Sequence, residues 1–231
     1  FKNAELAMYR AKRAGSDRIE VFETGMRREK DDRIQIESGL RRALEKSQLK
    51  VLYQPIVYLP TKELAGFEAL VRWDHPKLGI LNPVSFLPVA EETDLIVKIG
   101  AHVLLRAAKE CARWQTELPR TERPLFVSVN ISSRQIFRPE SVQEIRHVIG
   151  RNIVPPGALQ LELTESHIME NPEQAVDVLK ALGGSGVDLA LDDFGTGYSS
   201  LAYLQRFPFN KIKVDRELVH ASSTGSGAAI M

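Results

Sequence analysis

The chain contains 231 residues, of which 43% are hydrophobic and 26% are charged, and its formal net charge is +1. This balance excludes a strongly basic protein, so neither DNA nor RNA is expected as a partner, and no apolar run reaches the roughly 18 residues that a membrane helix needs. The single cysteine, Cys111, excludes an internal disulfide and fits a reducing compartment, which favours a cytoplasmic location.

The first 24 residues predict a helix followed by a strand. Apolar residues recur there at helical spacing, Gly15 is suited to end the helix, and residues 18–23 (RIEVFE) resemble a strand. The next segment, residues 25–47, is rich in charge and carries a partial apolar stripe of Ile34, Ile36, Leu40 and Leu44. We expect a solvated linker helix with one packed face. Acidic residues are interleaved with the basic ones, which disfavours a nucleic-acid role for this helix.

From residue 48 onward the pattern alternates between strands and helices. Strands are expected within residues 50–57, 66–73, 125–132, 159–166, 187–194 and 211–215. Helices are expected at residues 96–118, 141–149 and 172–182, with a short one at 201–205. This alternation predicts an α/β fold with a mostly parallel sheet, either open and doubly wound or closed into a barrel. The number of strands does not decide between the two.

Most of these strands carry unusual polar residues toward their carboxyl ends. Because the ends of parallel strands converge on one face of a barrel, we expect these side chains to form a site. They are Glu68, Asn130, Glu162, Glu165, Asp192, Asp193, Lys213 and Asp215. Oxygen donors without His or Cys suit Mg²⁺ or Mn²⁺ rather than zinc.

The number of carboxylates favours two metal ions. Glu68, Glu162, Asp192 and Asp193 together carry a charge that two divalent ions would balance. Paired metals about 4 Å apart are the usual apparatus for the attack of water on a phosphodiester. Lys213 would orient that water or offset the developing negative charge.

Each polar residue also has a purely structural interpretation. A single acidic residue at a strand end is more often a helix cap or an ion-pair partner, Asn130 could satisfy backbone groups, and Lys213 could pair with Asp192 or Asp215. The convergence of five strand ends favours a site. Glu165 is offset from Glu162 by an odd number of residues, so along a strand it would point to the opposite face. We therefore expect it to support the loop after Asp193.

Six segments, in order, are similar to the strand motifs of the EAL-domain cyclic di-GMP phosphodiesterases. They are YQPIV, GFEALVRW, SVNIS, LELTES, LDDFGTGYSS and KIKVD, and the letters EAL are residues 68–70. Residues 3–23 resemble the last helix and strand of a GGDEF domain. The resemblance therefore divides the chain into a GGDEF tail (1–24), a linker helix (25–47) and an EAL domain (48–231).

The resemblance implies a (β/α)₈ TIM-like barrel that opens cyclic di-GMP to linear pGpG with two Mg²⁺ or Mn²⁺ ions. Carried over by position, the first metal would be bound by Glu68, Asn130, Glu162 and Asp192. Asp192 would bridge to a second metal held by Asp193, and Lys213 would hold the attacking water. Glu165 would brace the loop 194–200, which in this family is tied to dimer contacts, so a homodimer is expected. Gln54 and Arg72 would contact the nucleotide.

The chain departs from this family at its end. The last two strands of the barrel should follow Val219, and we expect a barrel truncated after about six strands. We also expect both ends to be cuts through a longer protein, in which an upstream sensor could provide a membrane anchor. The isolated chain is then expected to be poorly stable and inactive, because an unclosed barrel exposes strand edges and core.

Three other functions are weighed against this one. The chain could be a non-catalytic receptor for cyclic di-GMP, although such members usually lose metal ligands. It could be a regulatory or dimerisation module for an upstream domain, which the linker helix would suit. An enolase-like lyase is a more distant alternative. The discriminating observation is whether nucleotide binding requires Mg²⁺ and is followed by cleavage.

Overall fold

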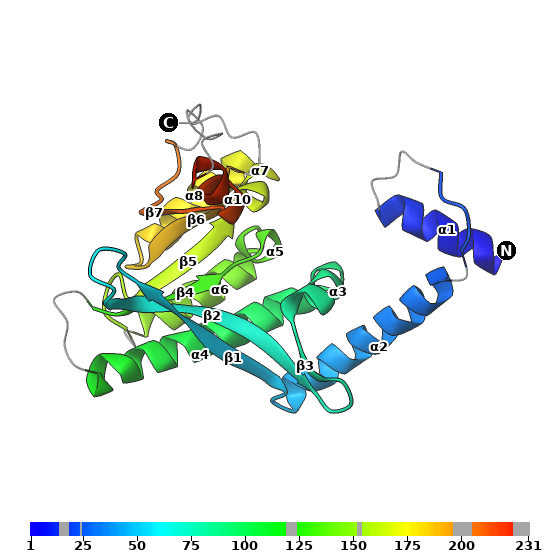
Figure 1. Cartoon of the computed structure of the whole chain (residues 1–231), viewed down its shortest axis with the longest axis horizontal. Helices are drawn as coiled ribbons and strands as arrows, with labels where there is room; N and C mark the ends of the chain where they lie inside the picture. Colours follow the sequence, from blue (N-terminus) through cyan, green and yellow to red (C-terminus); the bar gives the residue numbers. More distant parts are fainter. Residues whose placement is uncertain (14–18, 24, 119–123, 152–153, 196–204, 224–231) are drawn as a thin grey trace.

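The computed structural model describes residues 1–13, 19–23, 25–118, 124–151, 154–195 and 205–223 (Figure 1). The expected short helix at 201–205 falls almost entirely outside these ranges. The described part of the segment 18–23 is neither helix nor strand, so this predicted strand is wrong. Ile19 and Val21 are 95% and 77% exposed, and no neighbouring strand is present in the described residues to satisfy their backbone groups.

The described residues form a seven-stranded sheet in the order β1-β2-β4-β5-β6-β7, with β3 paired to β2. The strands are β1 (Leu49–Val57), β2 (Leu64–His75), β3 (Gly79–Leu81), β4 (Phe126–Asn130), β5 (Leu159–Thr164), β6 (Asp188–Phe194) and β7 (Lys211–Val214). From β2 through β4, β5 and β6 to β7 the pairing is parallel, as predicted. β1 and β7 lie at opposite edges, so the described sheet is open.

The first two strands pair in antiparallel fashion, which the alternation of strands and helices did not predict. The connecting residues, 58–63, are too few for the helical crossover that a parallel pair requires. They form a tight turn in which the Tyr58 amide donates to the Glu63 carbonyl over 2.9 Å. The register of this hairpin places Gln54 directly opposite Glu68.

The described ranges contain nine α-helices. They are α1 (Lys2–Arg13), α2 (Gly25–Glu45), α3 (Leu87–Glu92), α4 (Leu95–Glu117), α5 (Ser133–Ile136), α6 (Pro139–Gly150), α7 (Glu165–Met169), α8 (Pro172–Gly183) and α10 (Arg216–Ser223), with a 3₁₀ turn at Pro83–Ser85. The three long helices predicted after residue 95 therefore agree with α4, α6 and α8 to within two residues. No helix in the described ranges has the length and apolar character to cross a membrane.

The apolar core lies between these helices and the outer face of the sheet. Alternate strand residues such as Val127, Leu161 and Leu191 are fully buried there, against Ile99 and Ala107 of α4. Because side chains alternate along a strand, the residues between them point to the inner face. That second set is mainly polar, and it contains Asn130 of β4, Glu162 of β5 and Asp192 of β6.

The linker helix α2 packs on the core with its carboxyl-terminal half. Leu40 is fully buried, whereas Ile34 is 54% exposed and does not belong to the packed stripe. A Cβ atom on Gly39 would lie 2.7 Å from the Trp73 ring, so only glycine permits this approach. The amino-terminal half of α2 and all of α1 project from the body of the molecule (Figure 1).

Candidate functional site

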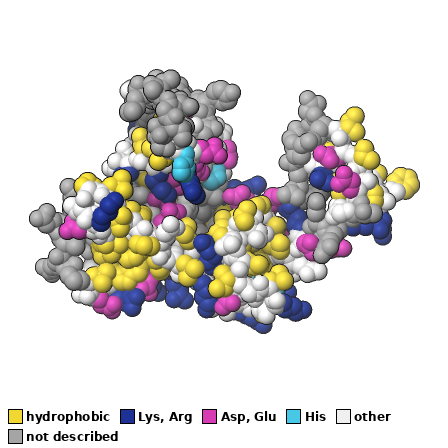
Figure 2. All heavy atoms as spheres, in the orientation of Figure 1, with side chains coloured by type: hydrophobic (Ala, Val, Ile, Leu, Met, Phe, Trp, Pro, Cys, Tyr) yellow, Lys and Arg dark blue, Asp and Glu magenta, His cyan; other side chains and the backbone are white. Residues whose placement is uncertain are grey.

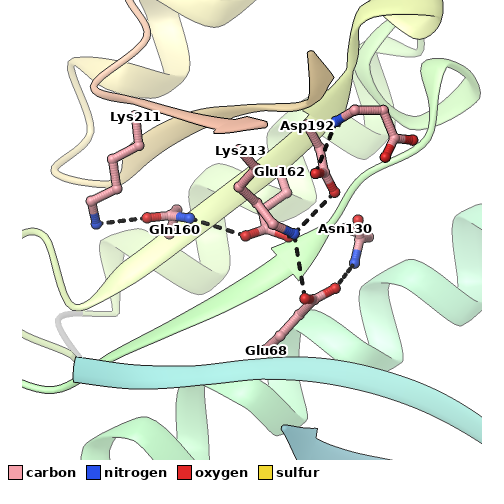
Figure 3. A network of polar contacts seen from close by, with 8 residues as sticks. Glu68, Asn130, Gln160, Glu162, Asp192, Lys211 and Lys213 are labelled. Carbon is pink, nitrogen blue, oxygen red and sulfur yellow. Dashed lines mark hydrogen bonds and ion pairs between the residues drawn. The ribbon is translucent and has the colours of Figure 1, made fainter. Parts of the chain in front are cut away.

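Acidic side chains from three strands converge on the amino group of Lys213 in β7 (Figure 3). Lys213 Nζ lies 2.7 Å from Glu162 Oε2 and 3.0 Å from Asp192 Oδ2. It also lies 3.3 Å from Glu68 Oε2 in β2. Asn130 joins the cluster by donating from Nδ2 to Glu68 Oε1 over 2.9 Å. The structure therefore brings together five of the residues that the sequence singled out.

The backbone register explains this convergence. In the parallel ladder Asn130 of β4 is paired with Glu162 of β5, so their side chains lie on the same face at the same level. The close approach of β2 to β4 is permitted by Gly66, where a Cβ atom would lie 2.3 Å from the carbonyl oxygen of Phe126. Glu68 is thereby held beside Ser128 of β4.

The charges in the cluster depend on one another. Burial raises the pKa of Glu162, although its hydrogen bond and ion pair with Lys213 act in the opposite direction. Burial by itself would lower the pKa of Lys213, but the hydrogen bond and charge of Glu162, together with Glu68 and Asp192, outweigh it and raise the pKa. Lys213 is therefore a cation at neutral pH. It is a hydrogen-bond donor only and cannot act as a general base there.

The donor set of this cluster fits a divalent hard cation. Three carboxylates and one ammonium leave a net formal charge of −2, and all the anionic donors are oxygens. Within the described ranges, no group of three His, Cys, Asp or Glu side chains already has the spacing needed to hold a metal ion. The fit thus rests on the chemistry and net charge of the donors.

Asp193 adjoins the cluster but makes different contacts. Its backbone has φ = 53°, a left-handed conformation that Asp adopts more readily than most residues. Its amide donates to Asp192 Oδ1 over 2.9 Å, which leaves Asp192 Oδ2 directed at Lys213. Burial, and then the charges of Asp192 and Asp215, raise the pKa of Asp193.

Glu165 lies in a helix, so the prediction that it points to the opposite face of a strand from Glu162 is wrong. It is the first residue of α7, whose N-cap is Thr164, and its side chain is buried. Its Oε2 atom has no hydrogen-bond partner among the described residues. Most of the loop that it was expected to brace, residues 196–200, lies outside the described ranges.

The remaining candidates lie at the edges of the site. Gln54 faces Glu68 across the β1–β2 hairpin and is exposed. Arg72 lies further along the same face of β2, where its guanidinium donates to the carbonyl of Val71. Asp215 is not in the cluster, since its carboxylate accepts the amide of Glu217 at the start of α10.

An apolar cavity of about 280 Å³ adjoins the cluster at the carboxyl ends of β2, β4 and β5. Asn130, Glu162 and His167 line one side, and residues of α3 and α4, including Leu87 and Ile96, line the other. In the space-filling view, acidic, basic and histidine side chains gather in the region of α7 and α10 (Figure 2). The cavity gives the polar cluster a neighbouring surface on which an aromatic ring could pack.

Sequence reasoning missed Gln160 and Lys211, which contact one another on the inner face below the cluster. Both are polar residues in otherwise apolar strands, two positions before Glu162 and Lys213 respectively. The two-residue period of a strand was the available signal, because it places each on the same face as its site neighbour.

Residues 37–231 match the EAL domain family. The bifunctional diguanylate cyclase/cyclic di-GMP phosphodiesterase MucR of Pseudomonas aeruginosa is 40% identical over 224 residues, which cover 95% of this chain and 32% of MucR. The cyclic di-GMP phosphodiesterase NbdA of the same organism is 39% identical over 219 residues, covering 95% of this chain and 28% of NbdA. The chain spans about a quarter to a third of the length of the curated relatives it matches.

The solved structure of the PaMucR phosphodiesterase in complex with c-di-GMP superposes with a TM-score of 0.77 and 39% sequence identity. The superposition covers 85% of this chain and 78% of that one. The solved neighbours are EAL domains with TIM-like barrels, which confirms the predicted fold class. By sequence and by fold, the chain belongs to the EAL domain family.

Proposed function

We propose that the natural protein carrying this sequence hydrolyses cyclic di-GMP to linear pGpG with two divalent cations, Mg²⁺ or Mn²⁺. The observation that carries the proposal is the convergence of three carboxylates, from β2, β5 and β6, on one point of the inner face. EAL phosphodiesterases generally depend on divalent metals. MucR and NbdA are named as cyclic di-GMP phosphodiesterases, and MucR has been solved with c-di-GMP bound.

The residues would divide the work as follows. One cation would be held by Glu68, Asn130, Glu162 and Asp192, and a second by Asp192 and Asp193. When bound, the two cations would activate a water molecule and neutralise charge on the phosphate. Lys213 would donate a hydrogen bond to the attacking water and so hold its oxygen in line with phosphorus. Water forms a new P–O bond, the P–O3′ ester bond breaks, and the departing 3′ oxygen takes up a proton.

The substrate would lie over the cavity beside the cluster. Gln54 and Arg72 would contact the nucleotide from the face of β1 and β2, with the Arg72 guanidinium released from its backbone contact to reach a phosphate or a guanine edge. The apolar wall formed by residues such as Leu87 and Ile96 is suited to pack against a base.

The proposal also assigns roles to the segments of the chain around the site. Residues 48–231 would carry the chemistry, and the linker helix (25–47) would connect them to a GGDEF-like tail (1–24). Glu165 would brace the loop 194–200 and through it a homodimer contact between EAL domains. Its buried carboxylate oxygen, which lacks a partner among the described residues, supports this role. A cytoplasmic location would agree with the nucleotide substrate.

Hydrolysis should require divalent cations. Without them the carboxylate cluster has only Lys213 as a counter-charge, and nothing activates the water. We expect linear pGpG to appear on chromatography when the natural protein carrying this sequence is incubated with cyclic di-GMP and Mg²⁺ or Mn²⁺. EDTA should abolish the product, and excess Mn²⁺ should restore it. Cation-dependent binding of cyclic di-GMP without any product would instead support a receptor.

A further inference from the structure

A line of polar side chains runs along the inner face of the sheet, beside the carboxylate cluster (Figure 3). Lys211 Nζ donates to Gln160 Oε1 over 2.6 Å, and Gln160 Nε2 donates to Glu162 Oε1 over 3.1 Å. The other oxygen of Glu162 accepts from Lys213. The two lysines of β7 thus reach two successive inward residues of β5, which lies two strands away in the sheet.

We propose that Gln160 and Lys211 are positioning residues that hold Glu162 in the orientation needed to bind a cation. This inference rests on the proposed function, because the cation is the one that Glu162 would bind there. Neither residue touches the proposed substrate or the reacting atoms. Their role would be to fix which oxygen of Glu162 faces the cluster.

The direction of this hydrogen-bonded line is dictated by chemistry. A lysine ammonium has donors only, so the oxygen of the Gln160 amide must face Lys211. The amide nitrogen must then face Glu162, whose ionised carboxylate only accepts. Without Lys211 the amide is free to turn its oxygen toward Glu162, where two acceptors would repel. Lys211 therefore determines that Gln160 donates.

The strand between β5 and β7 makes room for these contacts. Ala190 of β6 is the ladder partner of both Glu162 and Lys211, and it is fully buried. Its methyl group is small enough to let the longer side chains pass over β6. A larger residue at position 190 would occupy the space through which Lys211 reaches Gln160.

Lys211 is itself held in place from other directions. Its Nζ atom lies 3.3 Å from Asp188 Oδ2 and 4.1 Å from the centroid of the Phe126 ring. Gln160 is only 2% exposed. Both members are thus fixed before any ligand arrives, as expected of groups that orient a metal ligand.

These contacts determine which carboxylate oxygen of Glu162 faces the cluster. With Oε1 engaged by Gln160, only Oε2 is directed at the cluster, so the carboxylate presents a single oxygen. Outer partners of this kind typically contribute about 10- to 100-fold to metal affinity. Replacing Gln160 with leucine, which has a similar volume, should free Oε1 and weaken Mn²⁺ binding about tenfold or more.

The test measures Mn²⁺ binding by calorimetry and by the EPR signal of free Mn²⁺, on the natural protein and its Gln160→Leu variant. Hydrolysis of cyclic di-GMP is followed as a function of Mn²⁺ concentration. For a positioning role, the variant should require more Mn²⁺ but recover activity when Mn²⁺ is saturating. The matched control is Gln143→Leu, an exposed glutamine on α6, which should bind Mn²⁺ as the natural protein does.

A second pair of variants keeps the test decisive if leucine at position 160 disturbs folding. Lys211→Met retains the apolar stem but removes the donor, and it should also weaken Mn²⁺ binding. Lys211→Arg retains donors to Gln160, so this variant should bind Mn²⁺ about as tightly as the natural protein. A purely structural role would instead lower the free energy of unfolding in urea without changing Mn²⁺ affinity in the folded protein.

The outcomes separate this inference from the proposed function. Unchanged Mn²⁺ affinity in both Gln160→Leu and Lys211→Met, with hydrolysis intact, overturns the inference and leaves the function standing. Weakened Mn²⁺ binding in these variants, with rescue by Lys211→Arg, supports it even if the natural protein binds Mn²⁺ without cleaving cyclic di-GMP. Failure of the natural protein to bind Mn²⁺ overturns both.

Discussion

Replacing Asp192 with alanine is expected to reduce the rate of cyclic di-GMP hydrolysis by about a thousandfold. Asp192 is the residue proposed to contact both cations. Its two oxygens are already committed in opposite directions, one to the amide of Asp193 and the other to Lys213. Removing the carboxylate deletes a shared ligand and releases the backbone turn that places Asp193. The measurement is the initial rate of pGpG formation at saturating Mn²⁺.

The matched control for this change is Asp177→Ala on the exposed face of α8. It removes the same functional group away from the inner face, so the rate should match that of the natural protein. Retention of most of the activity by Asp192→Ala, under conditions in which the protein is folded, would show that Asp192 is not a shared metal ligand.

Replacing Lys213 with methionine is expected to lower the free energy of unfolding by about 2 kcal/mol at neutral pH in metal-free buffer. The Glu162 side chain is completely buried and has Lys213 as its ion-pair partner, so the variant leaves a buried carboxylate without its cation. Partial exposure of Lys213 reduces the cost from that of a fully buried pair. Urea denaturation in the presence of EDTA measures the difference.

The cost of this substitution should depend on pH. Burial already raises the pKa of Glu162, and loss of the ammonium raises it further. An acid whose pKa is higher in the folded state takes up a proton on folding. Its ionisation therefore lowers the free energy of unfolding as the pH rises. The loss starts at the pKa of the carboxyl group in the unfolded chain, ordinarily 4.5, and continues through its higher pKa in the folded protein. The natural protein and the variant should differ little below about pH 4 and differ fully near pH 7.

Lys213 stabilises the folded protein, and the pH dependence of this contribution follows from its own raised pKa. Because its pKa is raised in the folded state, that contribution is complete at neutral pH and is lost only in strongly alkaline solution. Lys98→Met, at an exposed position of α4, is the control and should have little effect at either pH. A Lys213→Met penalty of equal size at pH 4 and pH 7 would contradict the assignment of Glu162 as the group left unpaired.

The long elements and the convergence of acidic residues could be predicted because each depends on local periodicity. The helical spacing of apolar residues in α4 and the alternation in β5 are visible in single segments. The antiparallel start of the sheet could also have been predicted, since the connection after Val57 is too short to hold a helix. The strand expected at 18–23 was wrong because strand-like composition does not supply a neighbouring strand.

The features that could not be predicted depend on where neighbouring elements end and on the order of the strands in the sheet. Glu165 was assigned to a strand because the sequence does not show that β5 ends at Thr164 and a helix begins. The line from Lys211 to Glu162 requires knowing that β6 separates β5 from β7 and presents Ala190 between them. Such relations join residues far apart in sequence, so they follow from the sheet order rather than from any one motif.

The most direct test of the metal site is anomalous diffraction at the manganese edge, from crystals of the natural protein grown with Mn²⁺. Two anomalous peaks about 4 Å apart are expected, one in contact with Glu162 and both in contact with Asp192. No peak at the carboxylate cluster, with Mn²⁺ bound elsewhere or not at all, would contradict the proposed two-metal mechanism.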